Sequence, residues 1–176
     1  MRHIYEKSNS KSDAKMSKNV VLTGMMGVGK STIGKNLAKK LSFRFVDIDQ
    51  LIEKQEGISI SKIFKSKSES YFRSVENKIT LQELVKKNMV ISLGGGAFLD
   101  KNIRNTVKNN SVSFWLDLKV NILINRLSKS KKRPLLFNKN LSETVNKIYL
   151  ERRKIYNEAN FRIRCNDLKP DAIINK

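Results

Sequence analysis

Two residue types that often carry chemistry are almost missing from this chain. Cys165 is the only cysteine among 176 residues, so no disulfide can form within the chain. It ends the alternating apolar run 161–165, where a small buried hydrophobe is the expected role. His3 is the only histidine and lies in a polar N-terminal stretch. A zinc site of cysteine and histidine ligands and acid–base catalysis by histidine are therefore not expected.

The chain also lacks long apolar runs. No stretch reaches the roughly 18 residues that a membrane-spanning helix needs. Residues 1–17 are rich in Lys, Ser, Asp and Asn and do not contain the apolar core of a signal peptide. We expect a cytoplasmic protein with a polar, disordered N-terminal extension over residues 1–17, followed by one domain over residues 18–176.

Acidic residues are scarce. The chain has 36 lysines and arginines against 16 aspartates and glutamates, for a formal charge of +20. Such a charge is compatible with nucleic-acid binding, which stays open as an alternative. However, the lysines are dispersed and no basic motif is interleaved with aromatic residues that could stack on bases. We favour a protein that binds small anions and whose helix faces are covered by solvated lysines.

A glycine-rich motif follows the first apolar run. Residues 24–31 read G-M-M-G-V-G-K-S, directly after Val20, Val21 and Leu22 and before a helix-like stretch. This is the phosphate-binding P-loop pattern in its strand–loop–helix context. Its glycines allow close approach of the backbone to phosphate oxygens, and the N-terminus of the next helix supplies partial positive charge. The motif predicts binding of a nucleoside triphosphate, with Lys30 on the β/γ-phosphates and the Ser31 hydroxyl on Mg²⁺.

Apolar runs alternate with helix-like stretches along the whole chain, which predicts a three-layer α/β/α fold with a five-stranded parallel sheet. Expected strands are residues 19–23, 44–46, 89–93, 112–116 and 161–165. Expected helices are residues 30–41, 50–54, 59–64, 68–87, 100–108, 119–127 and 141–158, with a short last helix from Pro170. The long charged loop 128–140 is typical of a lid.

Polar and glycine signals follow three of the predicted strands. Asp47 and Asp49 close the second strand, and residues 94–96 are a glycine triplet after the third. Because ligands bind at the carboxyl ends of parallel strands, these groups and the P-loop should share one cleft. If the segment is extended, Asp47 and Asp49 face the same side. One carboxylate would then serve Mg²⁺ and the other would orient and deprotonate an acceptor hydroxyl.

Six stretches, taken in order, carry a family resemblance. They are G-M-M-G-V-G-K-S-T at 24–32, F-V-D-I-D at 45–49, F-R-S-V-E at 72–76, G-G-G at 94–96, R-P-L-L at 133–136 and E-R-R-K-I-Y at 151–156. The set resembles the shikimate kinase family of small P-loop kinases over about residues 18–174. This resemblance implies a P-loop NTPase fold with strand order 2-3-1-4-5, a substrate-binding subdomain over residues 48–76 and a lid over residues 128–140.

The resemblance further implies ATP-dependent phosphorylation of the 3-hydroxyl of shikimate, in aromatic amino acid (chorismate) biosynthesis. Lys30, Asp49 and Arg133 would be catalytic, with Asp49 as the base. Shikimate would be bound by Asp49, Arg73, Gly94, Gly95, Gly96, Arg152, Phe64 and Phe72, the two arginines holding its carboxylate. ATP would be bound by Gly27, Val28, Gly29, Lys30, Ser31, Thr32, Arg126, Arg133 and Pro170. Mg²⁺ would be held by Ser31 and Asp47.

Several expectations remain open to test. The resemblance implies a monomer that acts on small molecules, with no nucleic-acid or membrane partner. The last helix is short and the charge is high for such a kinase. The alternatives are another small P-loop kinase, for gluconate or a nucleoside monophosphate, a basic nucleotide-dependent nucleic-acid-binding protein, and a non-catalytic binding module.

Overall fold

The computed structural model describes residues 18–129, 140–166 and 168–175. Its centre is a parallel sheet of five strands in the order β2-β3-β1-β4-β5, as expected. The strands are β1 (Asn19–Thr23), β2 (Arg44–Asp47), β3 (Met89–Ser92), β4 (Ser111–Asp117) and β5 (Phe161–Arg164). The predicted N-terminal extension and nearly all of the predicted lid lie outside the described residues.

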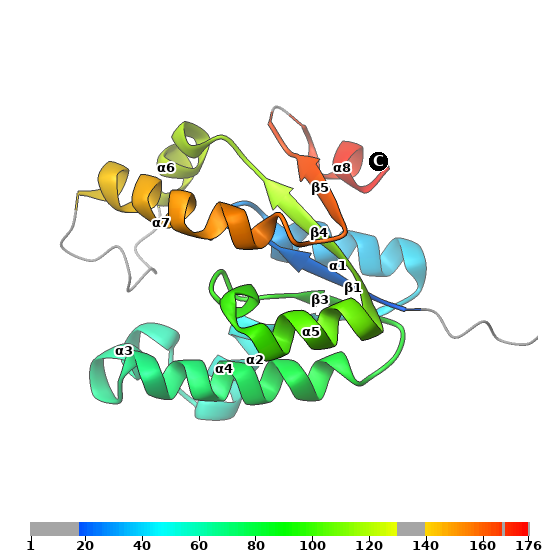
Figure 1. The fold of residues 1–176 in the computed structure, drawn as a ribbon, viewed down its shortest axis with the longest axis horizontal. Coiled ribbons are helices and arrows are strands. Elements are labelled where there is room, and N and C mark those ends of the chain that lie inside the picture. The colour runs from blue at the N-terminus through cyan, green and yellow to red at the C-terminus, as the bar shows by residue number, and fades with distance from the viewer. Residues whose placement is uncertain (1–17, 130–139, 167, 176) are drawn as a thin grey trace, which may run out of the picture.

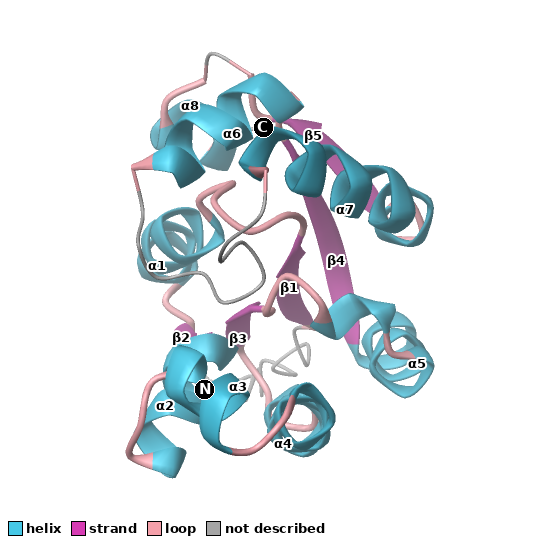
Figure 2. Cartoon of the chain, turned by 90° about the vertical axis from the view of Figure 1, so that its left-hand side faces the viewer, coloured by secondary structure: helices cyan, strands magenta, loops and turns pink. Residues whose placement is uncertain are grey.

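Helices cover both faces of this sheet (Figures 1 and 2). Helix α1 (Lys30–Leu41) lies on one face and packs against the short α8 (Pro170–Ile174), while α5 (Lys101–Asn110) and α7 (Leu141–Tyr156) lie on the other. The remaining helices are α2 (Ile48–Glu56), α3 (Ile60–Ser66), α4 (Glu69–Leu84), the 3₁₀ turn η1 (Ala97–Leu99) and α6 (Val120–Ser128). The three-layer architecture is therefore confirmed.

The central strands form the core. Val21 and Leu22 of β1 and Val90 and Ile91 of β3 are at most 2% exposed, because both faces of these strands are covered by helices. The register pairs Asp47 with Ser92 and Leu22 with Ser92, so β1, β2 and β3 end within one residue of each other at one edge. The segments that follow these three strands therefore meet at that edge, as the sequence predicted.

Helices α2, α3 and α4 connect β2 to β3 along the chain and form a helical lobe, in which α4 packs against α5 (Figure 1). Side-chain caps start each of them: Asp47 accepts from Gln50 N, Ser59 from Lys62 N and Ser68 from Tyr71 N. Gly57 ends α2 with φ 67°, a left-handed conformation that glycine adopts without strain. The predicted subdomain 48–76 corresponds to α2, α3 and the first half of α4.

Helix α4 ends at Leu84, earlier than the predicted residue 87. The cause lies far away in the sequence. The buried side chain of Asn19, at the start of β1, donates to Leu84 O at 3.1 Å and to Lys86 O at 2.7 Å and accepts from Met89 N at 3.0 Å. It thus satisfies carbonyls that the helix end leaves unpaired, and it fixes the turn into β3.

No helix within the described part of the chain combines the length and apolarity that crossing a bilayer requires.

Candidate active site

The loop between β1 and α1 has the backbone shape that phosphate binding needs. Gly24, Gly27 and Gly29 have φ of 134°, 79° and 104°, values that residues with a side chain rarely adopt. A Cβ on Gly24 would lie 2.5 Å from Leu116 O, so this glycine is also required for packing against β4. Lys30 Nζ donates to Gly24 O at 2.9 Å and to Met25 O at 3.0 Å. These contacts hold the ammonium group against the backbone at the start of the loop.

A cavity of about 170 Å³ opens over this loop. Of the predicted nucleotide residues, Gly27, Gly29, Lys30, Ser31 and Thr32 line it. Val28 is 2% exposed and packs into the core, so its side chain does not face the cavity. Because the loop and the first turn of α1 surround the cavity, unpaired backbone N–H groups and the positive end of the helix are available to an anion.

Two of the predicted ATP-binding residues, Arg126 and Pro170, differ in whether they contact this loop or line its cavity. Arg126 of α6 donates from Nη1 to Val28 O at 3.2 Å and to Gly27 O at 3.4 Å, so it reaches the P-loop directly. Pro170 is the exposed first residue of α8 and is not among the residues that line the two cavities described here. Arg133 lies outside the described residues.

Ser31 and Asp47 are in direct contact. The Ser31 hydroxyl donates to Asp47 Oδ2, and Asp47 Oδ1 accepts from Gln50 N at 3.3 Å. Both side chains are oxygen donors, which suits Mg²⁺. The described residues contain no cluster of three or more His, Cys, Asp or Glu that could hold a metal. Mg²⁺ usually keeps several waters and phosphate oxygens as ligands, so two protein oxygens such as those of Ser31 and Asp47 are enough to hold it.

The geometric argument for Asp49 was wrong, although its location was right. Asp47 ends β2 and caps α2 with φ −106° and ψ 116°, and the helix begins at Ile48. Asp49 thus lies in the first helical turn and not in an extended segment. It still lines the nucleotide cavity and a second, larger cavity beside it.

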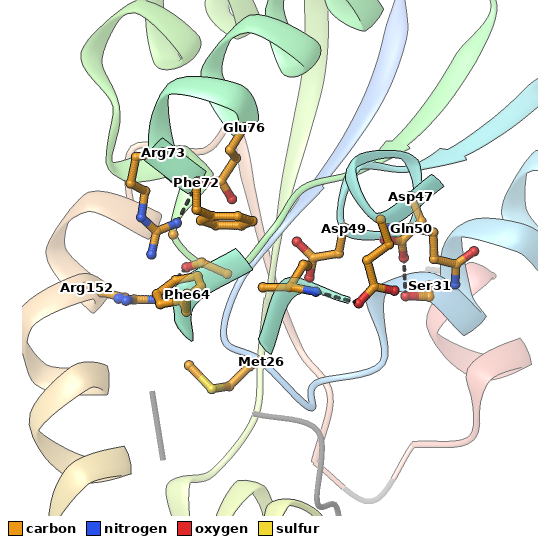
Figure 3. Close-up of a pocket in the computed structure, with 14 residues that line it drawn as sticks. Met26, Ser31, Asp47, Asp49, Gln50, Phe64, Phe72, Arg73, Glu76 and Arg152 are labelled. Carbon is orange, nitrogen blue, oxygen red and sulfur yellow. Dashed lines mark hydrogen bonds and ion pairs between the residues drawn. The ribbon is translucent and has the colours of Figure 1, made fainter. Parts of the chain in front are cut away.

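This second cavity has a volume of about 300 Å³ and is lined by side chains of the helical lobe, the P-loop and α7 and by the backbone of the glycine loop (Figure 3). Both cavities share Met26, Ser31, Asp47, Asp49 and Gly95, so they are adjacent. Predicted substrate residues that line the larger one are Asp49, Phe64, Phe72, Arg73, Gly95, Gly96 and Arg152.

Two arginines enter the larger cavity from different elements. Arg152 of α7 is 8% exposed and donates to Gly95 O at 2.7 Å. Arg73 of α4 lies over the Phe72 ring, 5.1 Å from its centroid, and Phe72 in turn packs against Phe64 at 5.0 Å. A cavity with an aromatic wall and two guanidinium groups is suited to a small ring compound that bears a carboxylate.

Glu76 is a site residue to which the sequence analysis gave no role, although it ends the quoted stretch F-R-S-V-E. It is 2% exposed, and its Oε2 accepts from Arg73 Nη1 at 2.6 Å. Burial raises the pKa of Glu76, and the nearby Asp49 charge adds to this, while the Arg73 and Arg152 charges oppose it. Burial by itself would lower the pKa of Arg73, but the Glu76 and Glu69 carboxylates together outweigh it and raise that pKa. The sequence could have indicated this pair, because residues three apart in a helix lie on the same face and oppositely charged ones can pair there.

The glycine triplet gives room to these charged groups. A Cβ on Gly94 would lie 2.3 Å from Glu76 Oε1 and 2.7 Å from Asp49 Oδ1. One on Gly96 would lie 2.4 Å from Arg73 Nη1. Gly94 is buried and is not among the residues that line the larger cavity, so its role is to let the two carboxylates approach.

Residues 26–176 match the family model described as Shikimate kinase. The chain belongs to the shikimate kinase family. It is 44% identical to the shikimate kinase of Persephonella marina, over 90% of this chain and 96% of that one. It is 42% identical to the shikimate kinase of Sulfurihydrogenibium sp., over 90% and 95% of the two chains.

Solved structures extend the family likeness to three dimensions. Shikimate kinase from Acinetobacter baumannii, in complex with shikimate, superposes with a TM-score of 0.87 at 30% identity, covering 90% of this chain and 89% of that one. The P-loop kinase fold and the kinase family expected from the sequence are thereby confirmed.

Proposed function

We propose that this chain transfers the γ-phosphoryl group of ATP to the 3-hydroxyl of shikimate, as its family implies. The observation that supports this most strongly is the shared boundary of the two cavities. Asp49 lines both, so an acceptor hydroxyl beside its carboxylate would face the phosphate end of a nucleotide in the P-loop. Such placement is what direct in-line transfer requires.

The larger cavity supports shikimate as the acceptor. Arg73 and Arg152 would bind its carboxylate, and Phe64 and Phe72 would flank its ring. Asp49, at the boundary, would orient and deprotonate the reacting hydroxyl. The backbone of Gly95 and Gly96 would complete the pocket, while Gly94 keeps space for Asp49 and Glu76.

In the nucleotide cavity, the P-loop backbone over residues 27–32 would hold the phosphates. Ser31 and Asp47 would hold Mg²⁺, which would neutralise phosphate charge when bound. Lys30, together with Arg133 of the predicted lid 128–140, would stabilise the charge of the transferring group. Arg126 and Pro170 would flank the adenine. We further infer a monomeric enzyme of the cytoplasm, where its ATP is available.

The test is a coupled assay of ADP release with ATP and Mg²⁺, run in parallel with shikimate, gluconate and AMP. We expect stimulation by shikimate alone. Stimulation by gluconate or AMP would contradict the acceptor assignment. A salt-sensitive shift of an oligonucleotide without turnover of any acceptor would favour the nucleic-acid alternative.

The assignment of the carboxylate site is tested by replacing Arg152 with Ala and titrating each ligand separately. We expect shikimate binding to weaken by one to two orders of magnitude, since a charge-assisted bidentate contact is lost. ATP binding should stay near that of the unmodified protein, because Arg152 does not line the nucleotide cavity. Loss of ATP binding instead would contradict the role.

A further inference from the structure

Tyr156, the last residue of α7, makes a contact in the substrate site that the proposed function does not use. Its ring is completely buried, and its hydroxyl donates to Gly95 O at 2.5 Å. Arg152, one turn earlier on the same helix, donates from Nη1 to the same oxygen at 2.7 Å. Two side chains of one helix therefore converge on one backbone carbonyl of the glycine loop.

This shared contact restricts the loop. A carbonyl oxygen has two lone pairs, and here Tyr156 and Arg152 each supply a donor. Because the peptide unit is planar, the direction of Gly95 O also sets the direction of the Gly96 N–H, which points away from α7. Glycines have wide backbone freedom, so this peptide needs such an external contact to keep one orientation.

Packing in the core explains why residue 156 has an aromatic ring, but not why that ring bears a hydroxyl group. The ring packs against Trp115, with centroids 6.0 Å apart, and a phenylalanine would fill the same space. Burial raises the pKa of Tyr156, although the Arg152 charge opposes this, so the group stays a phenol at neutral pH. A buried hydroxyl needs a hydrogen-bond partner, and the partner is the site loop.

We propose that Tyr156 is a positioning residue of the substrate site, which holds Gly95 O and through it the Arg152 guanidinium in the orientation that receives the substrate carboxylate. The inference rests on the proposed role of Arg152. Tyr156 itself touches no reacting group and is not among the residues that line the cavity.

The test replaces Tyr156 with Phe and uses Tyr149→Phe as the matched control. Tyr149 is on the same helix, and its hydroxyl also donates one hydrogen bond, to Asp117 Oδ1 at 3.1 Å, away from the cavity. We expect Tyr156→Phe to raise KM for shikimate about five- to tenfold, the effect of losing one buried hydrogen bond. KM for ATP and kcat should stay within about twofold, and Tyr149→Phe should leave all three unchanged. Melting temperatures of both variants check that each is folded at the assay temperature.

A double-mutant cycle with Arg152→Ala separates positioning from a general structural effect. If Tyr156 acts through Arg152, adding Tyr156→Phe to Arg152→Ala should change KM for shikimate by less than twofold. Full additivity, an equal rise in KM for ATP, or a shikimate KM equal to that of Tyr149→Phe would each overturn the inference. An Arg152→Ala variant with unchanged shikimate KM would instead refute the proposed carboxylate site on which the inference rests.

Discussion

Most residues that line the nucleotide cavity lie in one stretch, residues 26–32, whereas the lining of the substrate cavity comes largely from α2, α3, α4, the glycine loop after β3 and α7. In the nucleotide half of the site, glycine φ values and the start of α1 set the geometry, so backbone groups would supply most of the binding contacts. In the substrate half, Glu76 and Arg152 are buried and Asp49 and Arg73 are partly buried. Hydrogen bonds join Arg73 to Glu76 and Arg152 to the glycine loop. Substitutions in the nucleotide half should therefore lower mainly the turnover rate, and substitutions in the substrate half should weaken mainly acceptor binding.

Among substitutions in the nucleotide half, Lys30→Ala should have the largest effect. We expect kcat to fall by about 10²-fold or more, because a charge that stabilises the transferring phosphoryl is removed. Shikimate binding should persist, since Lys30 does not line the substrate cavity. Steady-state kinetics and calorimetric titration of shikimate measure the two quantities. A rate near that of the unmodified protein would refute the role of Lys30.

In the substrate half, Gly94→Ala should weaken acceptor binding and, because Asp49 is the proposed base, should also lower kcat. The new methyl group would displace the carboxylates of Glu76 and Asp49, since it would lie 2.3 Å and 2.7 Å from their oxygens. Overpacking of this kind costs about 1–3 kcal/mol, so KM for shikimate should rise by roughly an order of magnitude. ATP affinity should not change.

Gly95→Ala is the matched control for that variant. Its Cβ would meet nothing closer than Met26 N at 3.4 Å, an ordinary contact, so a much smaller rise in KM is expected. Equal effects of Gly94→Ala and Gly95→Ala would mean that the loop tolerates no side chain, whatever surrounds it.

A smaller effect is expected in stability. The pKa of Glu76 lies above its ordinary value of 4.5 in the folded protein, mainly because of burial. The folded state therefore binds this proton more tightly than the unfolded state, and stability falls as pH rises from 4.5 through the raised pKa. For a chain of this size, each kcal/mol corresponds to about 2–4 °C in melting temperature.

Melting curves of the unmodified protein and of Glu76→Gln, recorded across this pH window, measure the effect. The difference between the two melting temperatures should change with pH, with the unmodified protein losing relative stability as pH rises. A difference that is constant across the window would show that Glu76 has the same pKa in both states.

The two halves also differ in how well the sequence predicted them. The P-loop was predictable because its residues are adjacent and its glycines have one physical explanation. The strand order followed from the family resemblance and is confirmed. Asp49 was placed in the right cavity by an incorrect argument, because the capping of α2 by Asp47 starts the helix one residue after the strand.

What the sequence could not predict depends on contacts between distant residues. The end of α4 is set by Asn19, which precedes it by a whole βαβ unit and more. The roles of Glu76 and Tyr156 arise from burial beside Gly94 and Gly95, and no local pattern encodes that burial. The roles assigned to the site residues are predictions that the experiments above test. Arg133 lies outside the described residues.

Within the lobe, α4 packs against α5 and η1, whereas α3 packs mainly against α2 and α4, and this has a consequence for redesign. Exchanging α3 would replace Ile60 and Phe64 in the lining of the larger cavity while leaving Asp49 of α2 and the P-loop unchanged. Arg152 would remain, because it belongs to α7. Chimeras made in this way should accept new carboxylic acids more readily than new neutral alcohols, so the scaffold is a natural starting point for kinases of other small hydroxy acids.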